Sequence, residues 1–182
     1  MSGQKTAFRT SDLTQTAICA ALIAVCSWIS VPAPVPFTLQ TFGVFCVLGI
    51  LGGKRGPAAV LLFLLLGAAG LPVFAGFNGG LGALLGATGG YLLGFVFIGL
   101  ICLLGESLFG KRPAVYVVSM LLGLLACYAF GTAWFMRVYA RTAGEIALKT
   151  ALGWCVFPFV IPDLLKLGLA LLVASRVRRA IR

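Results

Sequence analysis

The sequence contains no histidine and only four acidic residues, Asp12, Glu106, Glu145 and Asp163. Without histidine, a histidine-based zinc site cannot form, and four dispersed acids cannot assemble an aspartate-rich site for magnesium and diphosphate. The sequence also lacks the GxxxxGK[ST] motif that binds nucleotide phosphates. These absences exclude the commonest membrane metalloenzymes, and any ATP-driven step would need partner subunits.

Charge is scarce throughout the chain. Only 10% of the 182 residues are charged, whereas 61% are hydrophobic and the mean hydropathy is +1.11, against about 45–50% apolar residues in soluble domains. Apolar segments fall at residues 12–30, 39–52, 57–73, 88–105, 113–136 and 151–175. We therefore predict an all-α integral membrane protein in which residues 1–182 form a single domain of six transmembrane helices.

The first apolar segment has a second interpretation, that of a cleaved signal peptide. It is long for such a peptide, and no small-residue cleavage site leads into a polar segment. The six cysteines all fall inside predicted spans, which favours packing over disulfides or metal binding. They are Cys19, Cys26, Cys46, Cys102, Cys127 and Cys155.

The basic residues predict the orientation of the chain. If both termini are cytoplasmic, ten of the 14 lysines and arginines lie on the inner side, as the positive-inside rule requires. Residues 1–11 then form a cytoplasmic N-terminal segment, and residues 176–182 form a basic cytoplasmic C-terminal segment. The basic residues are dispersed over short loops, so the net charge of +10 does not indicate a nucleic-acid partner.

The second and third segments are too short to cross a membrane, because 14 residues of helix span only about 21 Å. The missing depth would be covered by two uncharged outer loops, VPAPVPFTLQ and LPVFAGFNGGLGALLGATGG. Irregular backbone at membrane depth is tolerated only where it is buried in protein or lines a cavity. We expect membrane-dipping loops over a chamber; the alternatives are ordinary extracellular loops, or glycines that serve helix packing.

The last segment contains two ionisable residues, Asp163 and Lys166, three apart on one helix face. Counted from Arg176 at the inner interface, they lie about 20 Å and about 15 Å into the membrane. Ionisable residues at that depth indicate a functional site, although a mutually neutralising structural pair is the alternative. Pro162 precedes the aspartate and suggests a kink or a helix restart there.

Three blocks carry a resemblance to a known family: VPAPVPFTLQTFGV, LLGAAGLPVFAGFNGGLGALLGATGGYLLGF and IPDLLK. Over residues 12–175 the chain resembles the BioY family, the biotin-specific substrate-binding subunits of energy-coupling-factor (ECF) vitamin transporters. The resemblance implies a multi-pass protein of a bacterial or archaeal cell membrane, surrounded by lipid. It would bind biotin from outside as substrate, without a cofactor, and work with a transmembrane coupling subunit and a pair of cytoplasmic ABC ATPases.

The resemblance also implies which residues contact biotin. Those that match the polar contacts of the family, or lie within its matching loop motifs, are Asn78, Tyr91, Asp163, Lys166, Thr38, Gln40, Gly79 and Gly80. Where some relatives have an arginine after the tyrosine, this chain has Leu92. Lys166 would either meet the biotin carboxylate or keep Asp163 ionised, and the sequence leaves both roles open.

Helix-spaced alanines in the first segment suggest a contact surface. Ala17 and Ala21 are four apart, as are Ala20 and Ala24, so each pair leaves a shallow groove on one helix face. The resemblance implies that such a face docks on the coupling subunit, and we assign this role to Ala17 and Ala21; the alternative is packing within the bundle. Two other functions remain open, an integral membrane enzyme that acts on a lipid and a stand-alone carrier.

Overall fold

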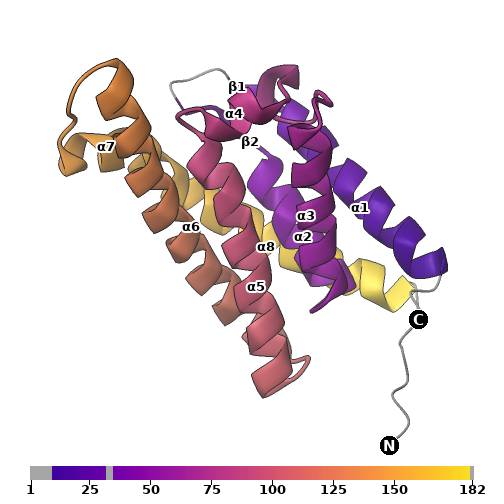
Figure 1. The fold of residues 1–182 in the computed structure, drawn as a ribbon. Helices are drawn as coiled ribbons and strands as arrows, with labels where there is room; N and C mark the ends of the chain where they lie inside the picture. Colours follow the sequence, from indigo (N-terminus) through magenta and orange to yellow (C-terminus); the bar gives the residue numbers. More distant parts are fainter. Residues whose placement is uncertain (1–9, 32–34, 181–182) are drawn as a thin grey trace, which may run out of the picture.

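The computed structural model describes residues 10–31 and 35–180, which fold almost entirely into helices (Figure 1). The helices are α1 (Thr10–Trp28), α2 (Gln40–Leu51), α3 (Arg55–Ala68), α4 (Leu81–Leu85), α5 (Gly89–Phe109), α6 (Pro113–Thr142), α7 (Leu148–Cys155) and α8 (Phe157–Ala180). A strand pair, β1 (Ser30–Val31) with β2 (Phe37–Thr38), and a 3-10 turn, η1 (Ala75–Phe77), complete the fold. The expectations for residues 1–9, Pro32, Pro34 and Arg182 lie outside the described residues.

Four helical stretches of the described chain are long and apolar enough to cross a membrane: α1, α5, α6 and the stretch Leu148–Ala180 that joins α7 and α8. The remaining apolar helices, α2 and α3, are shorter, with 12 and 14 residues. At 1.5 Å per residue they extend about 18 Å and 21 Å, less than the hydrocarbon thickness. The chain is therefore a helical, multi-pass membrane protein whose second and third helices are short, as predicted.

Some helix boundaries differ from the prediction. Helix α3 ends at Ala68 rather than near residue 73, because the chain turns at Gly70, where φ is +101°. The last predicted span is interrupted at Val156, whose φ and ψ are −124° and −59°. Helix α8 then starts at Phe157 and continues through Pro162, so the restart lies five residues before the expected one at Pro162. Pro158 fits this start. The N–H groups in the first turn of a helix have no acceptor within the helix, so the N–H that proline lacks is not needed there.

The two ends of the bundle differ in character (Figure 1). One end, here called the loop end, carries β1, β2, η1 and α4. The opposite end, here called the basic end, carries the α2–α3 turn, the α5–α6 turn and the end of α8. Its basic residues are Lys54, Arg55, Lys111, Arg112, Arg176, Arg178 and Arg179. The start of α1 lies at the same end as the end of α8 (Figure 1).

Small residues bring α5 and α6 close together. A Cβ on Gly94 would lie 2.6 Å from Cys127 Sγ, and one on Gly123 would lie 2.6 Å from Ile98 Cα. Helices in membranes associate through such close packing rather than through the hydrophobic effect. Lipid is as apolar as the buried side chains, so burying them from lipid gains little. The α5–α6 pair is thus a closely packed unit of the bundle.

Helix α1 is part of the bundle rather than an appendage. Its buried face, which includes Ala20, Ile23 and Ala24, belongs to the core that it shares with α2 and α3. At the loop end, Ser27 Oγ donates to the carbonyl of Val73, and Trp28 Nε1 donates to the carbonyl of Pro72 over 2.8 Å. These contacts disfavour the signal-peptide interpretation, since removing α1 would expose the core.

A carboxylate ties together the basic end. Glu106 of α5 accepts hydrogen bonds from the backbone N–H of Gly53 and from the hydroxyl of Tyr116. The guanidinium of Arg178 lies 4.6 Å from the centre of the Tyr116 ring, and its Nε donates to the carbonyl of Ile50 over 3.2 Å. Side chains from α5, α6 and α8 therefore hold the α2–α3 turn in place.

Candidate functional site

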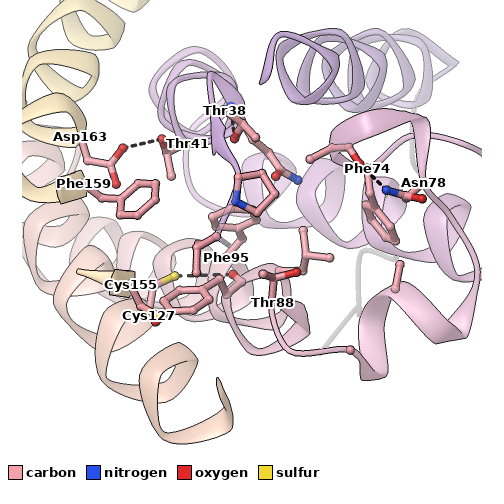
Figure 2. A pocket seen from close by; sticks show the side chains of 18 of the residues that line it. Thr38, Thr41, Phe74, Asn78, Thr88, Phe95, Cys127, Cys155, Phe159 and Asp163 are labelled. Carbon is pink, nitrogen blue, oxygen red and sulfur yellow. Dashed lines mark hydrogen bonds between the residues drawn. The ribbon is translucent and has the colours of Figure 1, made fainter. Parts of the chain in front are cut away.

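A cavity of about 490 Å³ lies between the loop end and the core. Its walls come from α2, α5, α6 and α8, and segments of the loop end, including η1 and α4, cover it. The volume is in the range of cavities that hold small organic ligands. Figure 2 shows Asp163 and Asn78 on opposite sides of this cavity, with Phe95 and Thr88 between them.

The cavity is closed toward the basic end by the core. Along each wall helix, the residues one or two turns beyond the cavity are fully or almost fully buried. These residues are Val44 and Leu48 on α2, Ile98 on α5, Met120 on α6, and Ala170 on α8. In the described part of the chain, the non-helical segments that cover the cavity therefore lie at the loop end.

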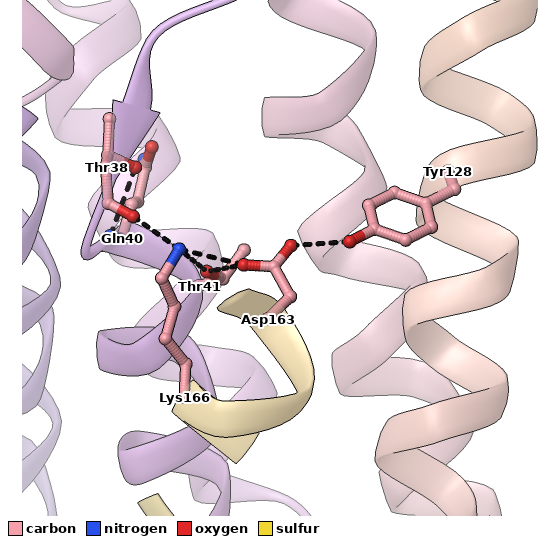
Figure 3. A network of polar contacts seen from close by, with 6 residues as sticks. All are labelled: Thr38, Gln40, Thr41, Tyr128, Asp163 and Lys166. Carbon is pink, nitrogen blue, oxygen red and sulfur yellow. Dashed lines mark hydrogen bonds and ion pairs between the residues drawn. The ribbon is translucent and has the colours of Figure 1, made fainter. Parts of the chain in front are cut away.

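The predicted ion pair forms part of the wall. Lys166 Nζ lies 2.8 Å from Asp163 Oδ1, and the two residues are only 6% and 2% exposed. Their spacing on α8 places both side chains on the same helix face, as the sequence predicted. Figure 3 shows this pair at the centre of a polar network that joins α8 to α2 and α6.

Lys166 is held by several groups at once. Its ammonium donates to Asp163 Oδ1, to the carbonyl of Thr38 over 2.7 Å and to the hydroxyl of Thr41 over 3.2 Å. It also lies 4.4 Å from the centre of the Phe37 ring, a favourable cation–π contact. A lysine ammonium has three N–H donors, so the protein itself uses all of them.

Asp163 receives hydrogen bonds from three helices. The Thr41 hydroxyl on α2 donates to Oδ1 over 2.8 Å, alongside Lys166 of α8. The Tyr128 hydroxyl on α6 donates to Oδ2 over 2.6 Å. A buried charge is costly unless it is paired and hydrogen-bonded, and this carboxylate is both.

Gln40, at the start of α2, is a buried polar residue with an unused donor. The residue is only 4% exposed and lies in the cavity wall, and its side-chain Nε2 has no hydrogen-bond partner among the described residues. Leaving a buried donor unpaired costs about 1–3 kcal/mol. The amide is therefore poised to donate to an acceptor on a ligand.

The other predicted contacts lie along the opposite part of the wall. Tyr91 packs against Gly131, and its hydroxyl is 2.9 Å from that of Thr132. Asn78 is exposed, and its Nδ2 donates to the carbonyl of Ala75 over 2.8 Å. Gly79 approaches the chain so closely that a Cβ would lie 2.2 Å from the carbonyl oxygen of Leu71. All three residues line the cavity.

Gly80 differs from the other predicted residues. It is absent from the cavity wall, and its N–H donates to the carbonyl of Gly67 over 2.6 Å. Its φ of +86° favours glycine. Seven of the eight predicted residues thus line one cavity, and Gly80 shapes the turn beside it.

Sequence reasoning missed two residues of the network, Thr41 and Tyr128, which both line the cavity. Thr41 directly follows Gln40 in the first-loop motif, so its position was a usable signal. Tyr128 lies in the middle of an ordinary apolar helix, where an aromatic residue is more often core or lipid-facing. Cys127 and Cys155 also line the cavity, as free thiols.

The alanine pairs of α1 are separated by the fold. Ala20 and Ala24 are buried in the bundle, whereas Ala17 and Ala21 are exposed. Beside the exposed pair, Ile18 and Leu22 line a second cavity of about 560 Å³ at the basic end. This groove also contains three cations, those of Arg55, Lys111 and Arg178.

These features define a class of protein: a multi-pass helical membrane protein with a ligand-sized cavity beneath irregular loops at one end. The family model described as the BioY family matches residues 2–182. The chain belongs to the BioY family.

Individual relatives agree with this assignment. The chain is 43% identical to the "Biotin transporter BioY" of Thermotoga maritima over 173 residues, which cover 92% of this chain and 96% of that protein. It is 36% identical to the "Probable biotin transporter BioY" of Pyrococcus horikoshii over 171 residues, which cover 93% and 98%. These proteins are named transporters, so the lipid-enzyme alternative is set aside.

A solved structure has a similar fold. The crystal structure of the S-component for biotin from an ECF-type ABC transporter matches with a TM-score of 0.77 and 29% identity. The match covers 99% of this chain and 94% of that one. The arrangement of helices described above is therefore that of a transporter S-component.

Proposed function

We propose that this chain captures biotin from outside the cell and is the substrate-binding subunit of an ECF-type ABC transporter. One observation carries the proposal: a buried, fully paired Asp163–Lys166 network lies in the wall of a cavity of about 490 Å³, next to an unpaired amide donor. The names of the relatives and of the matching S-component support it. Biotin is in this proposal the transported substrate and not a cofactor.

The chemistry of biotin matches the wall. Its ureido ring offers two N–H donors beside a carbonyl acceptor, and its bicyclic ring system is otherwise apolar. The carboxylate of Asp163 can accept from an N–H, and the amide of Gln40 can donate to the carbonyl. Phe74, Phe95 and Phe159 line the cavity and would cover the rings.

The proposed topology is that of six membrane helices in one domain, residues 1–182, with α2 and α3 too short to span alone. The basic end faces the cytoplasm, since it carries most of the described lysines and arginines. The loop end then faces outward and dips into the outer half of the membrane. The membrane is the cell membrane of a bacterium or an archaeon.

The proposed partners are a transmembrane coupling subunit and a pair of cytoplasmic ABC ATPases. The exposed face with Ala17 and Ala21 lies on the helix that also supplies Ile18 and Leu22 to the groove at the basic end. Small side chains let a partner helix approach closely, and the groove beside them offers apolar contacts. This face is the proposed docking surface for the coupling subunit.

The test is biotin binding by the purified full chain, followed by isothermal titration calorimetry in detergent. We expect tight binding, and Asp163→Asn should weaken it by more than about tenfold, because losing a buried, charged hydrogen-bond partner costs about 1.5–3 kcal/mol. The matched control is Asp12→Asn, the same chemical change at the start of α1, where Asp12 pairs with the half-exposed Arg55. It should bind biotin as the parent does. Failure of the parent to bind biotin would contradict the proposed function.

A further inference from the structure

The charges in the cavity wall are few and already paired. Among the described residues that line the cavity, Asp163 and Lys166 are the only carboxylate and the only cationic side chain. They lie 2.8 Å apart and neutralise each other. An ionised ligand group placed beside them would meet a pair with no net charge, and burying an unpaired charge is costly.

Lys166 has no donor left for a ligand. Its three N–H groups point to Asp163 Oδ1, to the carbonyl of Thr38 and to the hydroxyl of Thr41. A ligand carboxylate could bind this ammonium only by displacing one of these partners. It would also approach Asp163, a carboxylate of like charge.

The hydrogen-bonding positions that the wall leaves free beside the ion pair match a neutral ligand group. Asp163 Oδ2 receives one hydrogen bond, from Tyr128, and a carboxylate oxygen has room for a second. Gln40 Nε2 is a buried donor without a described partner. One free acceptor and one free donor match a group that presents an N–H next to a C=O.

The far side of the cavity is also neutral. Asn78 lies across the cavity from Asp163, with Thr88 between them (Figure 2), and Asn78 is exposed. A ligand tail that extends toward them therefore reaches amide and hydroxyl groups and the water at the loop end, and meets no described cation.

We infer that this cavity recognises the neutral ureido head of biotin and does not read its carboxylate, so that biotin and amides of biotin bind alike. The inference rests on the proposed function and names its ligand class: ureido compounds with a free or an amide-capped tail. The head lies against Gln40 and Asp163, and the tail points toward the loop end.

The experiment is competition against radiolabelled biotin on the purified full chain at neutral pH. Its ligands are biotin, the primary amide of biotin, and a biotin methylated on one ureido nitrogen. The amide has the size of biotin without its charge, and we expect its affinity to be within about tenfold of that of biotin. The methylated head lacks one N–H donor, and we expect it to bind more than about tenfold more weakly.

A wall variant provides a second readout. Gln40→Met keeps the length of the side chain and removes the unpaired buried amide, so folding should not suffer. We expect it to weaken biotin and the amide by the same factor, since both present the same head.

The outcomes separate the two claims. If biotin binds and the amide binds more than about tenfold more weakly, the cavity reads the carboxylate and the inference is wrong while the proposed function stands. The inference is also wrong if the methylated head binds as well as biotin, or if Gln40→Met affects one ligand only. If biotin itself does not bind, both claims fail.

Discussion

At the scale of single residues, Tyr128 connects the ion pair to a helix that carries no other polar contact to it. Its hydroxyl donates to Asp163 Oδ2 over 2.6 Å, and it is the α6 donor to this buried carboxylate. The phenol ring fills space in the cavity wall. The residue therefore both stabilises the charge of Asp163 and fixes the direction in which Oδ2 accepts from a ligand.

Replacement of Tyr128 by phenylalanine tests this role. A hydrogen bond to a charged group is worth about 1.5–3 kcal/mol, so Tyr128→Phe should lower the apparent Tm of the ligand-free chain by roughly 3–12 °C. Saturating biotin should raise the Tm of the variant by less than it raises that of the parent, because Oδ2 is no longer held in the direction in which it accepts from a ureido N–H. Thermal unfolding in detergent, with and without biotin, measures both effects.

Tyr139→Phe is the matched control. Tyr139 is on the same helix and stacks on Phe135, and no hydrogen bond from its side-chain hydroxyl is found in the described part of the chain. We expect the Tm of this control to stay within about 2 °C of the parent. Equal effects of the two substitutions would mean that the Tyr128 hydroxyl contributes nothing specific.

The sequence was enough to predict the ion pair but not the residues that hold it. Asp163 and Lys166 stand out because ionisable residues are rare inside apolar helices. Thr41 and Tyr128 are common residue types in membrane helices, and their role depends on which helices meet at Asp163. That is a long-range packing outcome, on which helical periodicity carries no information.

At the scale of elements, the segment between α3 and α5 is packed tightly onto the bundle. A Cβ on Gly67 would lie 2.0 Å from Phe74 Cζ. Phe74 is 2% exposed, packs edge-on against Phe63 and lines the cavity. The space left by one glycine thus seats an aromatic ring of the ligand site.

Gly67→Ala should therefore displace Phe74. Overpacking of a filled core costs about 1–3 kcal/mol, so we expect a lower apparent Tm together with weaker biotin binding. Gly168→Ala is the control: Gly168 is also helical, and a Cβ there meets nothing within 4 Å. Thermal unfolding and calorimetry measure the two effects, and a Gly67→Ala variant that matches Gly168→Ala in both would show that Phe74 moves without cost.

Element positions followed from hydrophobic runs, but element ends did not. The break at Val156 falls inside an apolar run that the sequence suggested as one span, and α6 extends to Thr142, six residues past the predicted end. Helix ends depend on backbone turns and on packing between neighbours, such as that of α7 on α6 and α8. A hydropathy average over a window of residues contains information on neither of these factors.

At the scale of the whole molecule, docking should depend on one face of α1. Replacing both Ala17 and Ala21 by tryptophan fills the shallow exposed face beside the groove at the basic end. We expect loss of co-purification with the coupling subunit and loss of ATP-driven uptake. The biotin affinity of the isolated chain should change little, since the cavity lies at the other end of the bundle.

A second exposed alanine pair provides the control. Ala129 and Ala133 on α6 have the same spacing and are both exposed. Their replacement by tryptophan should leave assembly and uptake intact. Uptake that survives in the α1 variant, or without any ATPase, would favour a stand-alone carrier, and joint loss of folding and binding would mean that the α1 face belongs to the bundle itself.

The buried layer beneath the cavity has a thermodynamic consequence. With Leu48, Ile98 and Met120 packed between the cavity and the basic end, and Glu106 fastening the turn beyond them, a ligand enters and leaves through the same opening. Occupancy of the isolated subunit then follows the biotin concentration on one side only, and binding by itself comes to equilibrium without net transfer. Under the proposed function, release to the other side therefore requires a step that the isolated subunit does not provide, and that step belongs to the partner subunits.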